Sequence, residues 1–222
     1  MDSNHLNETC GFCAEIYGLD NECNLLKSII TPQTELKSRI LTESDHFVVM
    51  PTIGAFVEGY VMIVSKEHYE CIGKMPEDAL HELEQLIIRI KACIRERYNM
   101  DVVCFEHGGV SCTKRAGGCI VHAHLHLVPC DVPIIGEVQE RGLTAIPIHD
   151  LSALQAIGKA NSSYLYFEDA DGQKYIMKEN VVISQFFRQL LAHHFGLGSQ
   201  WDWRQHFFLD NLVKIMERMS NI

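Results

Sequence analysis

The sequence contains no uninterrupted apolar run that approaches the roughly 20 residues of a membrane-spanning helix. Its first residues are acidic and polar, without the basic start and apolar stretch of a secretory signal. Basic residues are also few, since 19 Lys and Arg stand against 29 Asp and Glu and give a net charge of -10. This balance argues against nucleic acid as the main partner, because phosphate backbones attract a surplus of Lys and Arg. A small anionic ligand remains compatible, because one pocket can be positive on an acidic protein.

The nine cysteines do not form the even, regularly spaced set of a disulfide framework. Without an export signal we expect reduced thiols and a cytoplasmic protein. Cys10 and Cys13 have the two-residue gap of a zinc knuckle, which lets both thiolates reach one ion, although a redox pair has the same spacing. The others we interpret as small buried apolar residues: Cys23, Cys71, Cys93, Cys104, Cys112 and Cys130.

Short apolar segments rich in β-branched residues indicate a sheet. They predict antiparallel strands at residues 47–50, 60–64, 101–106 and 121–128. Met75–Tyr98 instead has apolar residues at helical spacing, with Pro76 in its first turn, and predicts one long amphipathic helix. The expected fold class is therefore α+β, an antiparallel sheet with a long helix.

The sequence changes character near residue 150. Two segments predict a β-hairpin and two predict helices: residues 164–167, 174–177, 183–195 and 206–219. About 70 residues are few for a separate core. We therefore expect a catalytic domain at residues 1–150 and a C-terminal α/β extension at residues 151–222 that packs on it.

Three histidines alternate along the last strand predicted before residue 150. His122, His124 and His126 would share one face, because alternate side chains of a strand point the same way. Such imidazoles can bind a metal, or one can act as a nucleophile that its neighbours orient. A solvent-facing strand with incidental histidines would not explain the glycine-rich loop Gly108–Gly118 that leads to it.

The segment His122-Ala-His124-Leu-His126-Leu-Val resembles the His-φ-His-φ-His-φ-φ motif of the histidine-triad (HIT) family of nucleotide hydrolases and transferases. The resemblance covers roughly residues 10–130 and implies a HIT-like fold. Phe105-Glu106-His107 is also similar to a Phe-Glu-Asn segment of the galactose-1-phosphate uridylyltransferase branch.

The resemblance also implies roles for individual residues. His124 would attack the α-phosphate of a nucleotide and form a nucleotidyl-histidine, and His126 would contact phosphate oxygens and help the leaving group depart. Lys114 and Arg115 we interpret as solvated loop charges. The implied substrate-binding residues are His107, Gly118, Cys119, Thr52 and Ile53. Two of these depart from the family, which usually has Asn in place of His107 and Ser or Thr in place of Cys119; a thiol donates weakly, so a backbone N–H is expected to make that contact.

Zinc-containing members of the family complete their metal site with two histidines. The matching residues here are His68 and His122, which with Cys10 and Cys13 would form a structural Zn²⁺ site. That site would hold the N-terminus against the triad strand. The resemblance further implies a homodimer through Met75–Tyr98 and the neighbouring strand, unless the extension covers this surface and leaves a monomer.

The C-terminal segment Trp201-Asp202-Trp203-Arg204 follows a predicted helix that carries Arg188. Two indoles with an arginine could stack a base and bind a phosphate. We favour the alternative of a packed interhelical loop in which Asp202 pairs with an arginine.

The sequence therefore predicts a hydrolase of nucleotidyl phosphoanhydrides or phosphoramidates, such as dinucleoside polyphosphates. A nucleotidyltransferase or phosphorylase would use the same intermediate. A nucleotide-binding regulatory module would keep the pocket with little turnover, but the presence of the nucleophile disfavours it.

Overall fold

The strands of the molecule form a single antiparallel sheet. A computed structural model describes residues 9–30, 36–109, 120–178 and 184–222. Within them, the strand order is β1-β2-β3-β5-β4-β7-β8-β6. The strands are β1 (Thr42–Glu43), β2 (Phe47–Pro51), β3 (Val61–Ser65), β4 (Val102–Gly108), β5 (His124–Pro129), β6 (Ile146–Ile148), β7 (Tyr164–Glu168) and β8 (Lys174–Lys178).

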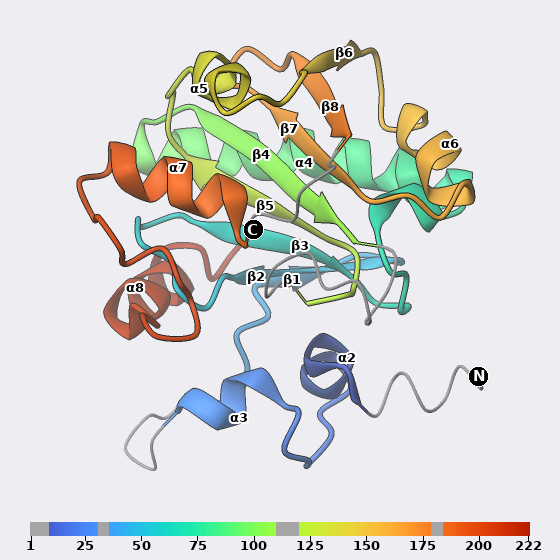
Figure 1. The fold of residues 1–222 in the computed structure, drawn as a ribbon. Coiled ribbons are helices and arrows are strands. Elements are labelled where there is room, and N and C mark those ends of the chain that lie inside the picture. The colour runs from blue at the N-terminus through green and yellow to red at the C-terminus, as the bar shows by residue number, and fades with distance from the viewer. Residues whose placement is uncertain (1–8, 31–35, 110–119, 179–183) are drawn as a thin grey trace.

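The helices lie around this sheet (Figure 1). They are α2 (Gly11–Ile16), α3 (Leu25–Ile29), α4 (Glu77–Tyr98), α5 (Ile135–Glu140), α6 (Ala153–Lys159), α7 (Phe186–His194) and α8 (Leu209–Arg218), with a 3-10 turn η1 at Ile72–Lys74. Figure 1 shows the long α4 running along the sheet, with α7 on the viewer's side and α2 and α3 below. None of the described helices is both long and apolar enough to cross a membrane.

The central strands are buried on both faces, and alternate residues define these faces. Val49, Ile63 and Leu125 belong to the large core that includes the buried face of α4. Met50 and Met62, from the opposite face, pack in a smaller cluster with α2. His124 and His126 alternate with Leu125, so they face away from the large core.

Helix α4 has charges at both ends that suit its dipole. Glu77 and Asp78 occupy the first turn, Arg95 and Arg97 the last, and Asn99 ends the helix in the left-handed conformation with φ of 51°. The predicted α+β architecture, with its antiparallel sheet, long helix, C-terminal hairpin and two C-terminal helices, is confirmed.

The C-terminal hairpin continues the sheet beyond β4. Strand β7 pairs with β4 from Cys104 opposite Glu168 to Gly108 opposite Tyr164. A buried ion pair of 2.5 Å between Lys91 of α4 and Glu168 also joins the hairpin to the long helix. Consequently β4 has a partner on each edge, β5 and β7. The division into residues 1–150 and 151–222 stays a prediction.

Several predicted boundaries differ from the structure, three of them near the pocket or in the C-terminal segment. Strand β5 begins at His124, not at residue 121, because residues 120–122 turn and the His122 N–H donates to the Ile120 carbonyl at 3.0 Å. Helix α8 begins at Leu209, not at 206, because Phe208 has a positive φ of 50°. Helix α7 begins at Phe186, and the residues before Ser184 lie outside the described part of the chain.

Candidate functional site

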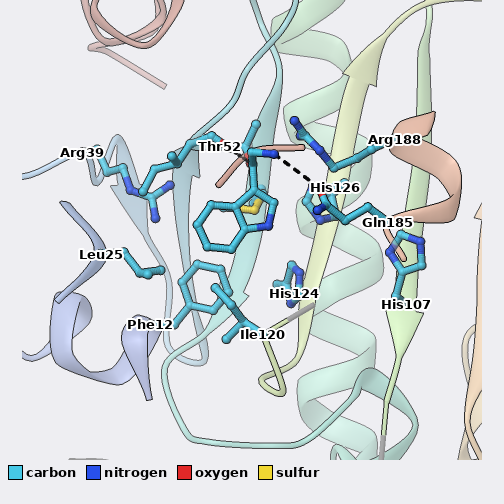
Figure 2. Close-up of a pocket in the computed structure, with 13 residues that line it drawn as sticks. Phe12, Leu25, Arg39, Thr52, His107, Ile120, His124, His126, Gln185 and Arg188 are labelled. Carbon is cyan, nitrogen blue, oxygen red and sulfur yellow. Dashed lines mark hydrogen bonds between the residues drawn. The ribbon is translucent and has the colours of Figure 1, made fainter. Parts of the chain in front are cut away.

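A pocket with an empty volume of about 440 Å³ lies beside β5 (Figure 2). Its walls come from four parts of the chain: the N-terminal helices, the β2–β3 region, strands β4 and β5, and the C-terminal segment. The lining residues are Phe12, Leu25, Arg39, Thr52, Ile53, Met62, His107, Ile120, His124, His126, Gln185, Arg188 and Trp203. The pocket is thus apolar over much of its wall, with histidines and arginines added from several elements.

His124 and His126 are two of these lining residues, and both are buried. Burial lowers the pKa of His124 to about 4 and holds the pKa of His126 well below its ordinary value, because the interior disfavours imidazolium. Both rings are therefore neutral near pH 7. The Phe105 ring stacks on the His126 ring with 4.4 Å between their centroids, and the centroids of the Phe12 and His124 rings lie 5.1 Å apart. These ring contacts hold both imidazoles in position.

The hydrogen bonds of His124 determine which nitrogen can react. Its Nδ1 lies 2.6 Å from the backbone oxygen of His122. A carbonyl only accepts, so Nδ1 carries the proton and donates it. In a neutral ring the other nitrogen, Nε2, then has a free lone pair.

The contacts of His126 favour the opposite tautomer. Its Nδ1 lies 2.9 Å from the Tyr60 hydroxyl, which also accepts a hydrogen bond of 3.2 Å from Arg188. The guanidinium can only donate, so this contact leaves the hydroxyl proton available for Nδ1 of His126. Nε2 of His126 then carries the ring proton. The two neighbouring rings present one lone pair and one N–H.

His107 stands at the end of β4, on the side of Gln185 and Arg188 in Figure 2. Its Nε2 accepts a hydrogen bond of 3.4 Å from the Phe187 backbone, and burial lowers its pKa to about 3. The structure thus brings His107, Thr52 and Ile53 into the pocket with both triad histidines. Gly118, Cys119, Lys114 and Arg115 lie outside the described residues.

Sequence reasoning undervalued the C-terminal segment. Asp202 does accept two hydrogen bonds of 2.9 Å from Arg204, as expected of a packed loop. However, Gln185, Arg188 and Trp203 also line the pocket. The available signal was Arg188 itself, a charge within the apolar sequence Phe-Phe-Arg-Gln-Leu-Leu.

Gly54 permits the close approach of this segment. Its φ is +78°, and a Cβ there would lie 2.7 Å from the Trp203 Cβ and 2.8 Å from an Arg188 nitrogen. Its N–H donates to the Phe207 carbonyl at 2.9 Å. A side chain at this position would push the C-terminal wall away from the pocket.

The predicted metal ligands form a cluster. One ligand atom from each of Cys10, Cys13, His68 and His122 lies within 4.8 Å of all the others. Nδ1 of His122 is 3.3 Å from the Cys10 sulfur and 3.5 Å from that of Cys13, and Nδ1 of His68 is 3.3 Å from the Cys13 sulfur. Ligands of a tetrahedral zinc ion, with bonds of about 2.0–2.3 Å, lie roughly 3.5 Å apart.

The surroundings of the cluster also suit a metal ion. Nε2 of His122 donates to the Ser65 backbone oxygen at 2.7 Å, which leaves Nδ1 unprotonated and directed at the thiols. The donor set therefore fits a closed Cys₂His₂ zinc site.

The HIT domain family model matches residues 33–132. The match covers less than half of the 222 residues of the chain. Three structures illustrate the likeness. A hypothetical histidine triad nucleotide-binding protein from Sulfolobus tokodaii strain7 is 23% identical with a TM-score of 0.37, over 43% of this chain and 62% of its own. The match thus spans less than two thirds of that protein.

Two further structures cover most of their own length. A HIT family protein from Bacillus anthracis is 18% identical with a TM-score of 0.42, over 69% of this chain and 94% of its own. A Zn-bound histidine triad family protein from Mycobacterium smegmatis is 18% identical with a TM-score of 0.41, over 69% of this chain and 98% of its own. Comparison with curated proteins gave no match.

The cluster predicts the metal content of the protein. The purified chain should hold about one zinc, and the double variant Cys10→Ser, Cys13→Ser should lose it and unfold at lower temperature, because structural zinc contributes several kcal/mol. Metal analysis and thermal unfolding measure both effects. Cys23→Ser, which changes a thiol outside the cluster, is the matched control and should keep the metal. Zinc-free protein purified without chelators would contradict the assignment.

The buried histidines of the pocket predict a pH dependence of stability. The pKa of His107 falls from 6.5 to about 3 on folding, so the unfolded chain binds the extra proton. The contribution of this residue is complete above pH 6.5 and is lost as the pH falls toward 3. His107→Asn should therefore flatten the loss of unfolding free energy below pH 6.5, measured by urea titration at several pH values. Equal slopes for the two proteins would disprove this contribution.

Proposed function

We propose that the pocket binds a nucleotide and that His124 Nε2 attacks its α-phosphate, as a nucleotide phosphohydrolase with a covalent intermediate would. The observation that carries the proposal is the 2.6 Å hydrogen bond from His124 Nδ1 to the His122 oxygen. In a buried, neutral ring this bond leaves the lone pair on Nε2, where a nucleophile needs it. The HIT domain, in a family that includes nucleotide-binding proteins, supports the choice of ligand.

The reaction takes place in two displacements. The lone pair of Nε2 forms a bond to phosphorus, and the bond from phosphorus to the leaving oxygen breaks with its electron pair. His126, whose Nε2 carries a proton, donates a hydrogen bond to that oxygen. In the second step a water oxygen attacks phosphorus, the P–N electron pair returns to His124, and one water proton is released to solvent.

The other lining residues hold the substrate in this proposal. Thr52 and Ile53 face the ribose and base, and His107 contacts phosphate oxygens through Nδ1, since its Nε2 accepts from the backbone. Gly118 and Cys119 remain proposed phosphate contacts on the strength of the family motif. When bound, Zn²⁺ supplies structural stability at the start of the triad strand.

The acceptor in the second step decides the class of enzyme. Water gives hydrolysis, phosphate gives phosphorolysis, and a sugar phosphate gives the transfer typical of the galactose-1-phosphate uridylyltransferase branch. Our proposal is hydrolysis. Product analysis with phosphate or sugar phosphates added would identify transfer or phosphorolysis instead.

The covalent step predicts the behaviour of His124 variants. His124→Gly should keep its fold and zinc but lose nucleotidyl transfer at least about 10³-fold, because no other lone pair replaces Nε2. Turnover and intact-mass detection of the nucleotidyl adduct provide the measurements. His149→Ala, an exposed histidine far from the pocket lining, is the matched control. An active His124→Gly protein would rule out the covalent mechanism, and a wild type with neither adduct nor turnover would favour a binding module.

The resemblance to the family also supports a homodimer, which we propose for helix α4 alone. Strand β4 pairs with β7, so a second copy has no free edge there. Ile88 of α4 is 65% exposed, which is unusual for such a large apolar side chain. The full chain should have twice the 25.3 kDa mass in light scattering, and Ile88→Asp should restore the single mass. A monomer at every concentration would show that no such dimer forms.

A further inference from the structure

Arg188 is a buried cation whose hydrogen bonds to the described residues all go to neutral groups. Its side chain lines the pocket, and the residue is 2% exposed. Its nitrogens donate to the Trp201 and Gly54 backbone oxygens at 2.9 and 2.7 Å and to the Tyr60 hydroxyl at 3.2 Å. No described carboxylate forms an ion pair with it. Three of the five guanidinium N–H groups are used, so two remain.

Other buried cations of the described chain have carboxylate partners. Arg39 also lines the pocket, but it binds both oxygens of Glu15 at 2.6 and 2.8 Å. Lys91 pairs with Glu168 at 2.5 Å. A buried charge without a counterion is costly, and the Phe56 and Tyr60 rings, 5.0 and 5.5 Å from the guanidinium, offset only part of this cost. The lining of the pocket therefore has one positive charge that an anionic ligand would balance.

The position of this charge relates it to the leaving group. Arg188 contacts Tyr60, and Tyr60 contacts His126, the residue proposed to face the leaving oxygen. Figure 2 shows Arg188, Gln185 and His126 together on one side of the pocket. We propose that Arg188 binds an anionic leaving group, so that the substrate is a nucleotidyl phosphoanhydride and not a phosphoramidate. This inference rests on the proposed function of the pocket.

The state of His126 supports the same choice independently. An amine leaving group must receive a full proton, whereas a phosphate departs as a stable anion. Burial keeps His126 neutral, and the loss of its one ring proton would leave an imidazolate. His126 can thus donate a hydrogen bond but is a poor acid. The positive charge of Arg188 would also repel a protonated amine.

The test compares two substrates with the same nucleotidyl group, a dinucleoside polyphosphate and a nucleoside 5′-phosphoramidate, prepared for each of the four common bases. The wild type should prefer the anhydride in kcat/KM. Arg188→Gln should reduce the ratio of the two kcat/KM values about 100-fold, as expected for the loss of one preorganised charged donor. Arg188→Lys, which keeps the charge, should recover part of this ratio.

Tyr60→Phe is the matched control. It removes the hydroxyl between Arg188 and His126 but leaves the guanidinium in place, so it should lower both rates and preserve their ratio. If Arg188→Gln lowers both rates equally, the residue acts only through packing or through Tyr60, and the proposal is overturned. A wild-type preference for the phosphoramidate overturns it as well.

A binding measurement separates this inference from the catalytic proposal. Calorimetry on the His124→Gly protein compares nucleoside diphosphates with the corresponding monophosphates. The diphosphate should bind more tightly, and adding Arg188→Gln should abolish the difference. If this difference in binding is found but the wild type shows no turnover, the catalytic proposal is refuted and the anion-binding role of Arg188 stands. Equal binding of both nucleotides before Arg188 is changed would refute the anion site alone.

Discussion

The position of His122 is the constraint on which the rest of the site depends. Its Nε2 donates to the Ser65 backbone, its Nδ1 faces the Cys10 and Cys13 thiols, and its carbonyl accepts the proton of His124. One residue therefore connects the metal cluster to the ring with the free lone pair. A shift of its backbone would change both the ligand geometry and the tautomer of His124, so stability and chemistry are coupled through one short segment.

Burial has two opposite effects in this pocket. It keeps His107, His124 and His126 neutral, because a low-dielectric interior disfavours imidazolium. Arg188 keeps its charge, because guanidinium stays protonated in proteins. The same low-dielectric interior screens this charge only weakly. A site with neutral rings and one permanent cation that has no described carboxylate partner can therefore favour an anion without protonating it.

The sequence was sufficient to identify the parts of the site that depend on local periodicity or spacing. Alternation placed His124 and His126 on one face, and the two-residue gap identified Cys10 and Cys13. The sequence could not identify contacts between distant segments. Arg39 and Arg188 line one pocket although they are far apart in the chain, and only the folded structure brings them together.

The sequence was also insufficient to predict which strands pair. The hairpin was expected from its turn, but its pairing with β4 is a long-range register that no local pattern specifies. The start of the triad strand at His124, three residues later than predicted, was also missed. The turn at Ile120–His122 before it depends on contacts with residues elsewhere in the chain, such as the hydrogen bond from the Ala123 N–H to the Tyr69 carbonyl.

The pocket uses both ends of the chain, from Phe12 to Trp203, and this has a consequence for the order of events during synthesis. The four candidate zinc ligands have all left the ribosome once His122 has emerged, before Trp203 is made. At that stage the nascent chain still lacks the C-terminal wall of the pocket beside His124 and His126. Gln185, Arg188 and Trp203 add this wall later, so the proposed nucleophile His124 gains its closed surroundings only after the segment that carries them has been made.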